Sequence, residues 1–124
     1  MFLKRYYNEL ITLRNECDSL CNDFLIQIGK DMFSYDVNSN EFKYLKTFYK
    51  TLLSQVSICL TSSHRTFSKK KIQSNITRIG EVYSHWNAIA QQLREQIAYE
   101  AFKQMDGNGN IDNLNNDIKN TVIQ

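Results

Sequence analysis

The stretch SKKKIQSNITRIGEVYSHWNAIAQQLREQIAYEAFKQM, Ser68 to Met105, decides the fold class of this chain. Its apolar residues alternate at spacings of three and four, which is typical of a helix that buries one stripe against partners. That stripe consists of Ile72, Ile76, Ile79, Tyr83, Trp86, Ala90, Leu93 and Ile97. A helix of this length would extend about 57 Å at the usual rise per residue, too far for a compact globule.

The same spacing occurs in two earlier segments, which are expected to be helical over about 2–33 and 40–63. Their apolar stripes are Leu3, Tyr6, Leu10, Leu13, Cys17, Leu20, Phe24 and Ile28, then Phe42, Leu45, Tyr49, Leu52, Val56 and Cys59. Polar clusters over 33–40 and 61–68 are expected to interrupt the helices. Asn38 with Glu41 resembles a capping box that would begin the second helix, and Ser68 is expected to cap the third.

These patterns predict an all-α fold. The expected architecture is an elongated three-helix antiparallel bundle over 1–105, with coiled-coil-like heptad seams and helices at about 2–33, 40–63 and 68–105. The chain has no proline and four glycines, which fits long helices joined by few turns. Gly80, inside the third helix, is expected at a kink or at a close helix contact.

Residues 106–124 differ in composition from the rest of the chain. They are rich in asparagine and poor in apolar residues, which favours a polar, mobile tail. The alternative is a short docked fourth helix, because four apolar residues of this segment keep helical spacing. These residues are Ile111, Leu114, Ile118 and Val122.

Charge and cysteine content limit the compartment and the partners. A net charge of +2 does not by itself favour nucleic acid or a membrane. The start of the chain lacks the pattern of a signal peptide, and no apolar run is long enough for a transmembrane segment. Three cysteines without a secretion signal indicate free thiols, so a cytoplasmic or otherwise intracellular, reducing location is expected.

Two features resemble metal sites but lack essential ligands. Cys17 and Cys21 have helical i, i+4 spacing, yet two thiols without a nearby histidine make half of a zinc site. The stretch QMDGNGNID, Gln104 to Asp112, resembles an EF-hand calcium loop. One register lacks both end ligands, and the other puts Ile111 where the loop needs glycine. We therefore expect no metal and no cofactor, and a helix that ends at this stretch.

The stretch RIGEVYSH, Arg78 to His85, carries a different hypothesis. An arginine and a histidine at this spacing resemble the loose motif of the HEPN family of α-helical nucleases. The resemblance implies a dimeric ribonuclease in which Arg78 and His85 act together on RNA. It covers two residues, and the polar residue that often follows the arginine is here Ile79. The alternative is a solvated arginine and a partly exposed histidine on a structural helix.

A basic cluster at 65–71 suggests contact with phosphate groups. It consists of Arg65, Lys69, Lys70 and Lys71. Such a cluster at a helix start can bind nucleic acid or an anionic lipid surface, although basic patches of this size are common on ordinary helices.

Surplus apolar residues lead to the main functional prediction. The aromatic residues at helical spacing, including Trp86, Tyr44 and Tyr99, are expected mostly in the core. Other apolar residues lie off the stripes and indicate a second covered face. The candidates for an interaction surface are Tyr7, Ile11, Phe48, Val82, Ile89 and Phe102. The prediction is a non-enzymatic protein–protein interaction module (an adaptor, assembly subunit or inhibitor) that forms a homodimer. Nucleic-acid binding through 65–71 and a HEPN-like ribonuclease are the alternatives.

Overall fold

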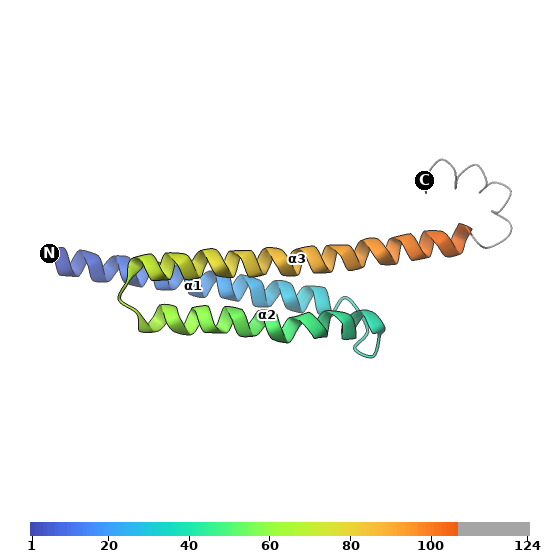
Figure 1. Cartoon of the computed structure of the whole chain (residues 1–124), viewed down its shortest axis with the longest axis horizontal. Coiled ribbons are helices and arrows are strands. Elements are labelled where there is room, and N and C mark those ends of the chain that lie inside the picture. The colour runs from blue at the N-terminus through green and yellow to red at the C-terminus, as the bar shows by residue number, and fades with distance from the viewer. Residues whose placement is uncertain (107–124) are drawn as a thin grey trace. The chain divides into compact units, whose positions relative to one another are not determined.

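A computed structural model describes residues 1–106, which contain three α-helices and no strand. These are α1 (Phe2–Met32), α2 (Asn40–Arg65) and α3 (Lys69–Asp106) (Figure 1). The prediction of an all-α fold is confirmed. None of the three helices, within the described range, is apolar enough over a sufficient length to cross a membrane. The expected C-terminal tail, its alternative docked helix and the rest of the calcium-like stretch beyond Asp106 lie outside the described residues.

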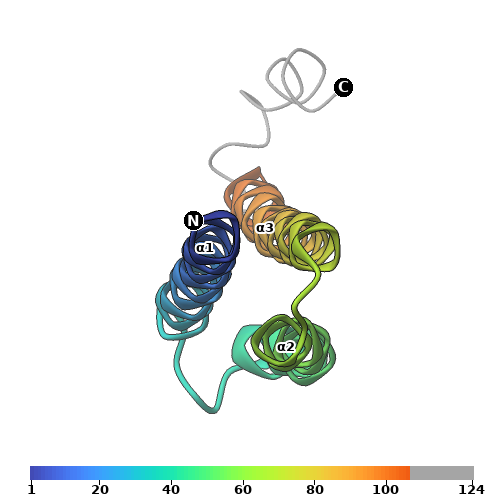
Figure 2. The ribbon, with the colours of Figure 1, turned by 90° about the vertical axis from the view of Figure 1, so that its left-hand side faces the viewer.

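The chain divides into two units, Met1–Ala90 and Gln91–Gln124, and each is described by itself. In the first unit, α1, α2 and the beginning of α3 lie alongside one another (Figure 2). Tyr6 of α1 donates a hydrogen bond to the carbonyl of Phe67, just before α3 begins. Further along both helices, Phe24 packs against Tyr83 with ring centroids 5.5 Å apart. Helices α1 and α3 therefore run in the same direction. Helix α2 runs in the opposite direction, since Phe42 near its start packs on Phe33 and His64 near its end pairs with Asp18.

The core of the first unit takes side chains from all three helices. Burying large aliphatic and aromatic side chains is the main stabilising contribution to such a fold. The largest fully buried apolar side chains are Leu10, Phe24, Leu45, Ile72, Ile79 and Trp86. The expectation that most aromatic residues would be buried was wrong for Tyr44 and Tyr99, which are exposed because they lie on outward faces of their helices.

A buried polar pair joins α1 to α3 inside this core. The indole Nε1–H of Trp86 donates to Oδ2 of Asp31 over 2.7 Å. The second carboxylate oxygen of Asp31 accepts from the Gln27 amide at 3.2 Å. A carboxylate so close to the core needs such donors, because burying it without hydrogen bonds would cost several kcal/mol on the order-of-magnitude scale for charged groups.

The start of α2 corrects the predicted capping box. The N-cap is Ser39 rather than Asn38, and its Oγ accepts from the Phe42 backbone N–H at 3.1 Å. Asn38 lies in the preceding turn, where its N–H donates to Oδ1 of Asp36 at 2.7 Å. Asparagine and serine are both favourable N-cap residues. Because Asn38 is held in the turn by Asp36, Ser39 is the residue that caps α2.

The break between α2 and α3 is shorter than the polar cluster at 61–68 suggested. Helix α2 continues to Arg65, so only 66–68 separate it from α3. The low helix propensity of this segment is overridden by tertiary contacts, since Ser63 is fully buried and bonded to Asn75. The expected cap of α3 is present, because the Lys71 N–H donates to Oγ of Ser68 at 3.2 Å.

Gly80 does not mark a close helix contact. A Cβ atom added at this glycine would meet nothing within 4 Å. Helix α3 continues unbroken through it from Lys69 to Asp106. The glycine is therefore tolerated at a small cost in helix propensity, and the space beside it is open.

Candidate functional site

The groove between α2 and α3 brings together the two residues of the ribonuclease hypothesis. Its volume is about 480 Å³, and both Arg78 and His85 line it. Apolar side chains of both helices form part of its wall. The complete lining is Thr47, Phe48, Thr51, Leu52, Gln55, Arg78, Glu81, Val82 and His85. The seven-residue spacing on one helix face explains why the arginine and the histidine share this groove.

The contacts of Arg78 limit what this groove can do. Its guanidinium donates to Oε1 of Gln55 at 3.3 Å and to Oε1 of Glu81 at 3.4 Å. Both Arg78 and Glu81 are more than half exposed, so this ion pair contributes little to stability. His85 is also exposed. A phosphate could displace these weak contacts, but the neighbouring Glu81 carboxylate would oppose its binding.

The basic cluster is spread over different surfaces of the first unit. Lys69 turns to α1, where its Nζ lies 2.7 Å from Oε1 of Glu9 and 5.0 Å from the centre of the Tyr6 ring. Arg65 lies instead beside Ile58, in a shallow hollow along α2. Lys70 and Lys71 are exposed at the start of α3. Lys69 and Arg65 therefore lie in different surroundings, the first against α1 and the second along α2.

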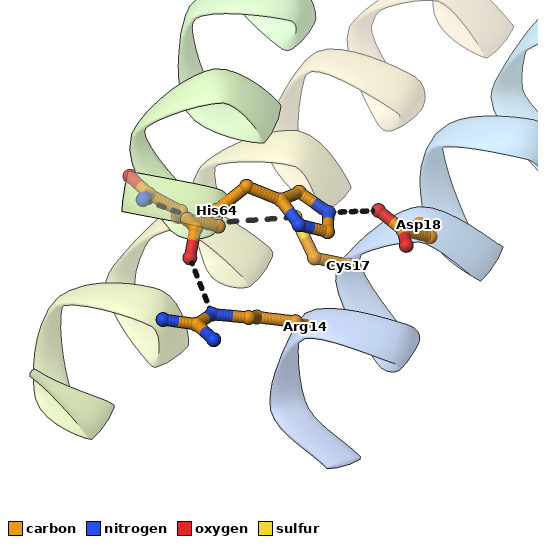
Figure 3. A network of polar contacts seen from close by, with 6 residues as sticks. Arg14, Cys17, Asp18 and His64 are labelled. Carbon is orange, nitrogen blue, oxygen red and sulfur yellow. Dashed lines mark hydrogen bonds and ion pairs between the residues drawn. The ribbon is translucent and has the colours of Figure 1, made fainter. Parts of the chain in front are cut away.

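A polar network at the end of α2 ties α1 to the α2–α3 connection (Figure 3). Arg14 donates from Nε to the Ser63 carbonyl at 3.2 Å and from Nη2 to the Thr66 carbonyl at 2.7 Å. The Ser63 carbonyl lies in the last turn of α2, and Thr66 is the residue that caps the helix. Carbonyls at a helix C-terminus have no partner within the helix, so the arginine supplies donors for them. The positive charge also complements the negative end of the helix dipole.

Two further contacts complete this network. The thiol of Cys17 lies 3.5 Å from the buried hydroxyl of Ser63, and His64 pairs with Asp18 at 2.6 Å. Both members of the His64–Asp18 pair are nearly half exposed, so its contribution is expected to be small. The only sequence signal for the network is Ser63, a polar residue facing a cysteine of the predicted apolar stripe. The contacts of this network join α1 to the end of α2 and, through the Ser63–Asn75 hydrogen bond, to α3.

The three cysteines are reduced and poorly suited to chemistry. Cys17 and Cys21 are buried, and Cys59 is half-buried. Burial, followed by interaction with Cys17, raises the pKa of Cys21 from 9.0 to about 12. Burial also raises the pKa of Cys59. A thiol in such surroundings stays protonated near neutral pH, and neither nucleophilic attack nor metal binding proceeds through the thiol form. Within residues 1–106, no group of three potential ligands could hold a metal ion.

The raised pKa of Cys21 gives a direct chemical prediction. At pH 8 the thiolate fraction of Cys21 should be about a thousandfold lower than at its ordinary pKa of 9.0. We therefore expect a thiol reagent to modify native Cys21 at least that much more slowly than the unfolded chain, with peptide mass spectrometry identifying the modified residue. All three cysteines should react at once in denaturant. Rapid modification of Cys21 in the native protein would contradict its burial.

The six surface candidates divide into three groups. Tyr7 and Ile11 are exposed on α1, whereas Phe48 and Phe102 are partly exposed. Two of the predicted positions were wrong, because Val82 and Ile89 are only 2% and 5% exposed within this single chain. Helix α3 contacts both neighbours, so its buried arc is wider than one coiled-coil stripe and includes these two residues.

Comparison of this chain with protein-family models, with curated proteins and with solved structures finds no match. The functional argument therefore rests on the residues and their geometry.

Proposed function

We propose that the chain is a non-enzymatic helical interaction module (an adaptor, assembly subunit or inhibitor) that pairs with a second copy of itself. In this proposal the three helices act as an elongated antiparallel bundle with coiled-coil-like seams. The supporting observation is a row of exposed apolar side chains on α1. Leu3, Tyr7 and Ile11 follow one another at four-residue intervals and are 78%, 53% and 37% exposed.

The row is suited to a two-fold interface. Residues four apart on a helix lie on one face, so these three side chains form a continuous strip. Two copies of α1 crossing antiparallel at Tyr7 would place Leu3 of each copy against Ile11 of the other. In a two-fold interface each contact occurs twice, which doubles the effect of a favourable residue or of a substitution. Three side chains per copy make a small interface, and a concentration-dependent dimer is expected.

A charge placed in the middle of the row should separate the two copies. Because the dyad brings both copies of position 7 together, Tyr7→Lys would bury two like charges and remove two aromatic contacts. We expect this change to raise the dimer dissociation constant by about a hundredfold, as for an interface hot spot. Light scattering coupled to size-exclusion chromatography over a range of protein concentrations measures it.

Ile26→Lys is the matched control, since Ile26 is a 50% exposed apolar residue of the same helix outside the row. This variant should dimerise as the wild type does. Circular dichroism of both variants checks that the helices are retained. A wild-type chain that stays monomeric at the highest concentration, or equal weakening by the two substitutions, would refute the proposed interface.

The second candidate function is RNA cleavage at the α2–α3 groove. The observation in its favour is that Arg78 and His85 line the same groove, where histidine could transfer a proton and arginine could stabilise phosphate charge. Cleavage of RNA by the wild type, lost in His85→Ala, would support it. Nucleic-acid binding through Arg65 and Lys69–Lys71 has less support, because Lys69 is engaged by Glu9. Retention of the protein on immobilised RNA that decreases as the salt concentration rises would support nucleic-acid binding.

A further inference from the structure

A row of exposed basic and hydroxyl side chains follows one face of α2. Successive members of the row are three or four residues apart, so they lie on one side of the helix. The buried residues Leu45, Leu52 and Val56 lie about half a turn away, so the row faces away from the core. We call this surface the basic row, and it consists of Lys43, Lys46, Lys50, Ser54, Ser57, Thr61 and Arg65.

Acidic neighbours on the same helix do not balance the positive charge of the basic row. The one acidic residue of α2 is Glu41, which lies outside the row. Within residues 1–106, the lysines and the arginine of the row form no ion pair, whereas Lys69 and Arg78 are each paired with a glutamate. An exposed surface of a single sign raises the local concentration of a polyanion and speeds its association.

One end of the basic row forms a shallow hollow of about 420 Å³. Its lining combines hydroxyl groups with one guanidinium and one apolar side chain: Ser54, Ser57, Ile58, Thr61, Ser62 and Arg65. Hydroxyl and guanidinium groups are the donors that proteins commonly present to phosphate oxygens. Among these lining residues there is no carboxylate, whereas Glu81 would oppose a phosphate in the α2–α3 groove.

The length and composition of the basic row favour a nucleic-acid duplex over a single strand. At about 1.5 Å per residue the row extends about 33 Å from Lys43 to Arg65. One turn of a B-form duplex is about 34 Å long. Single strands are bound largely by stacking of bases on aromatic side chains. The exposed aromatic residue of α2, Tyr44, lies off the row and packs against Phe48 with ring centroids 5.1 Å apart.

We infer that the basic row binds the phosphate backbone of a nucleic-acid duplex without reading its sequence. The lysines and Arg65 neutralise phosphates, and the hydroxyl groups between them donate to phosphate oxygens. An anionic membrane fits less well, because a membrane-bound helix inserts apolar side chains and Ile58 is the one large aliphatic residue exposed beside the row. The basic row is separate from Leu3, Tyr7 and Ile11, and it shares only Arg65 with the cluster at 65–71.

Titration of labelled duplexes with the full chain tests the inference. Fluorescence anisotropy is measured at several salt concentrations with DNA and RNA duplexes of about two helical turns, and the tighter complex identifies the kind of duplex. Four phosphate contacts predict a slope of about −3 to −4 for the logarithm of the association constant against that of salt concentration. Two unrelated sequences should bind equally. Binding to neither duplex at low salt, or tighter binding to the separated strands, would overturn the inference.

Two variants of equal net charge locate the contact. Lys46→Glu with Lys50→Glu reverses two charges of the basic row, whereas Lys70→Glu with Lys71→Glu reverses two exposed charges at the start of α3. We expect the first pair to weaken binding at least about tenfold and to make the salt slope shallower by about two, because each lysine contributes about one to the slope. The second pair should weaken binding less than about threefold.

The same two variants separate the basic row from the alternatives. Equal weakening by both would indicate attraction by net charge alone, and stronger weakening by Lys70→Glu with Lys71→Glu would assign binding to the cluster at 65–71. Either result would overturn the inference. Circular dichroism checks that both variants keep their helices, as expected for substitutions at exposed positions.

Vesicles of anionic phospholipid test the membrane alternative. Cosedimentation of the wild-type chain with vesicles rich in phosphatidylserine, without binding to either duplex, would overturn the inference. Failure of duplex binding is distinguishable from failure of the proposed self-association, because light scattering of the protein alone measures the α1 dimer.

Discussion

Trp86→Ala is expected to lower the free energy of unfolding by about 3–5 kcal/mol, the usual cost of removing a large buried aromatic side chain. Trp86 is completely buried and is the largest side chain in the core. It also supplies the 2.7 Å hydrogen bond to Oδ2 of Asp31, which is itself only 8% exposed. The alanine variant therefore combines a cavity with the loss of a donor to a buried carboxylate. Chemical denaturation followed by circular dichroism measures the change.

Trp86→Phe separates the two contributions. Phenylalanine retains most of the apolar volume but cannot donate to Asp31, so a smaller loss of about 1–2 kcal/mol is expected. Tyr99→Ala is the control for an aromatic residue of the same helix that is half exposed, and it should change stability by less than about 0.5 kcal/mol. If Trp86→Ala were no more destabilising than Tyr99→Ala, the packing of α3 against α1 would be wrong.

Arg14→Ala is expected to destabilise the first unit by about 2–3 kcal/mol. This change removes two charge-assisted hydrogen bonds to the Ser63 and Thr66 carbonyls at the end of α2. It also removes the guanidinium from the ring of Phe67, whose centre lies 5.4 Å away. Because these contacts join α1 to the α2–α3 connection, amides of the last turn of α2 should also exchange faster with solvent.

Two variants calibrate the effect of Arg14. Arg14→Lys keeps the charge but presents one ammonium in place of a planar fork, so about half of the loss is expected. Arg5→Ala, which removes an exposed arginine one residue before Tyr6, should alter stability by less than about 0.5 kcal/mol. An Arg14→Ala protein as stable as Arg5→Ala would show that the last turn of α2 does not depend on these bonds.

The fold class could be predicted from the sequence because local patterns specify it. Apolar residues at spacings of three and four, few glycines and no proline leave little besides long helices. The positions that failed are those decided by contacts between distant segments. Val82 lies off the predicted apolar stripe of α3, yet it lines the groove beside residues of α2. A stripe that faces a single partner helix omits a residue that packs against a second partner helix.

The candidate sites depended still more on tertiary structure. The seven-residue spacing of Arg78 and His85 places them on one helix face, and this could be read from the sequence. The hydrogen bond between Arg78 and Gln55 joins two different helices, and no local sequence pattern predicts it. In the same way Lys69 looked like part of a basic cluster, whereas Glu9, sixty residues earlier in the chain, engages its charge. Tyr7 and Ile11 were identified by their position off the stripe, and they are exposed.

Disulfide trapping at Tyr7 tests the proposed self-association most directly. A cysteine close to a two-fold axis meets its own copy, so Tyr7→Cys in a Cys59→Ser background should form a covalent dimer under mild oxidation. Ile26→Cys, equally exposed on the same helix but away from the row, should remain largely monomeric. Non-reducing electrophoresis with intact-mass analysis distinguishes the products. Rapid dimer formation by Tyr7→Cys alone is the predicted result, and equal, slow cross-linking of the two variants would contradict pairing through this face of α1.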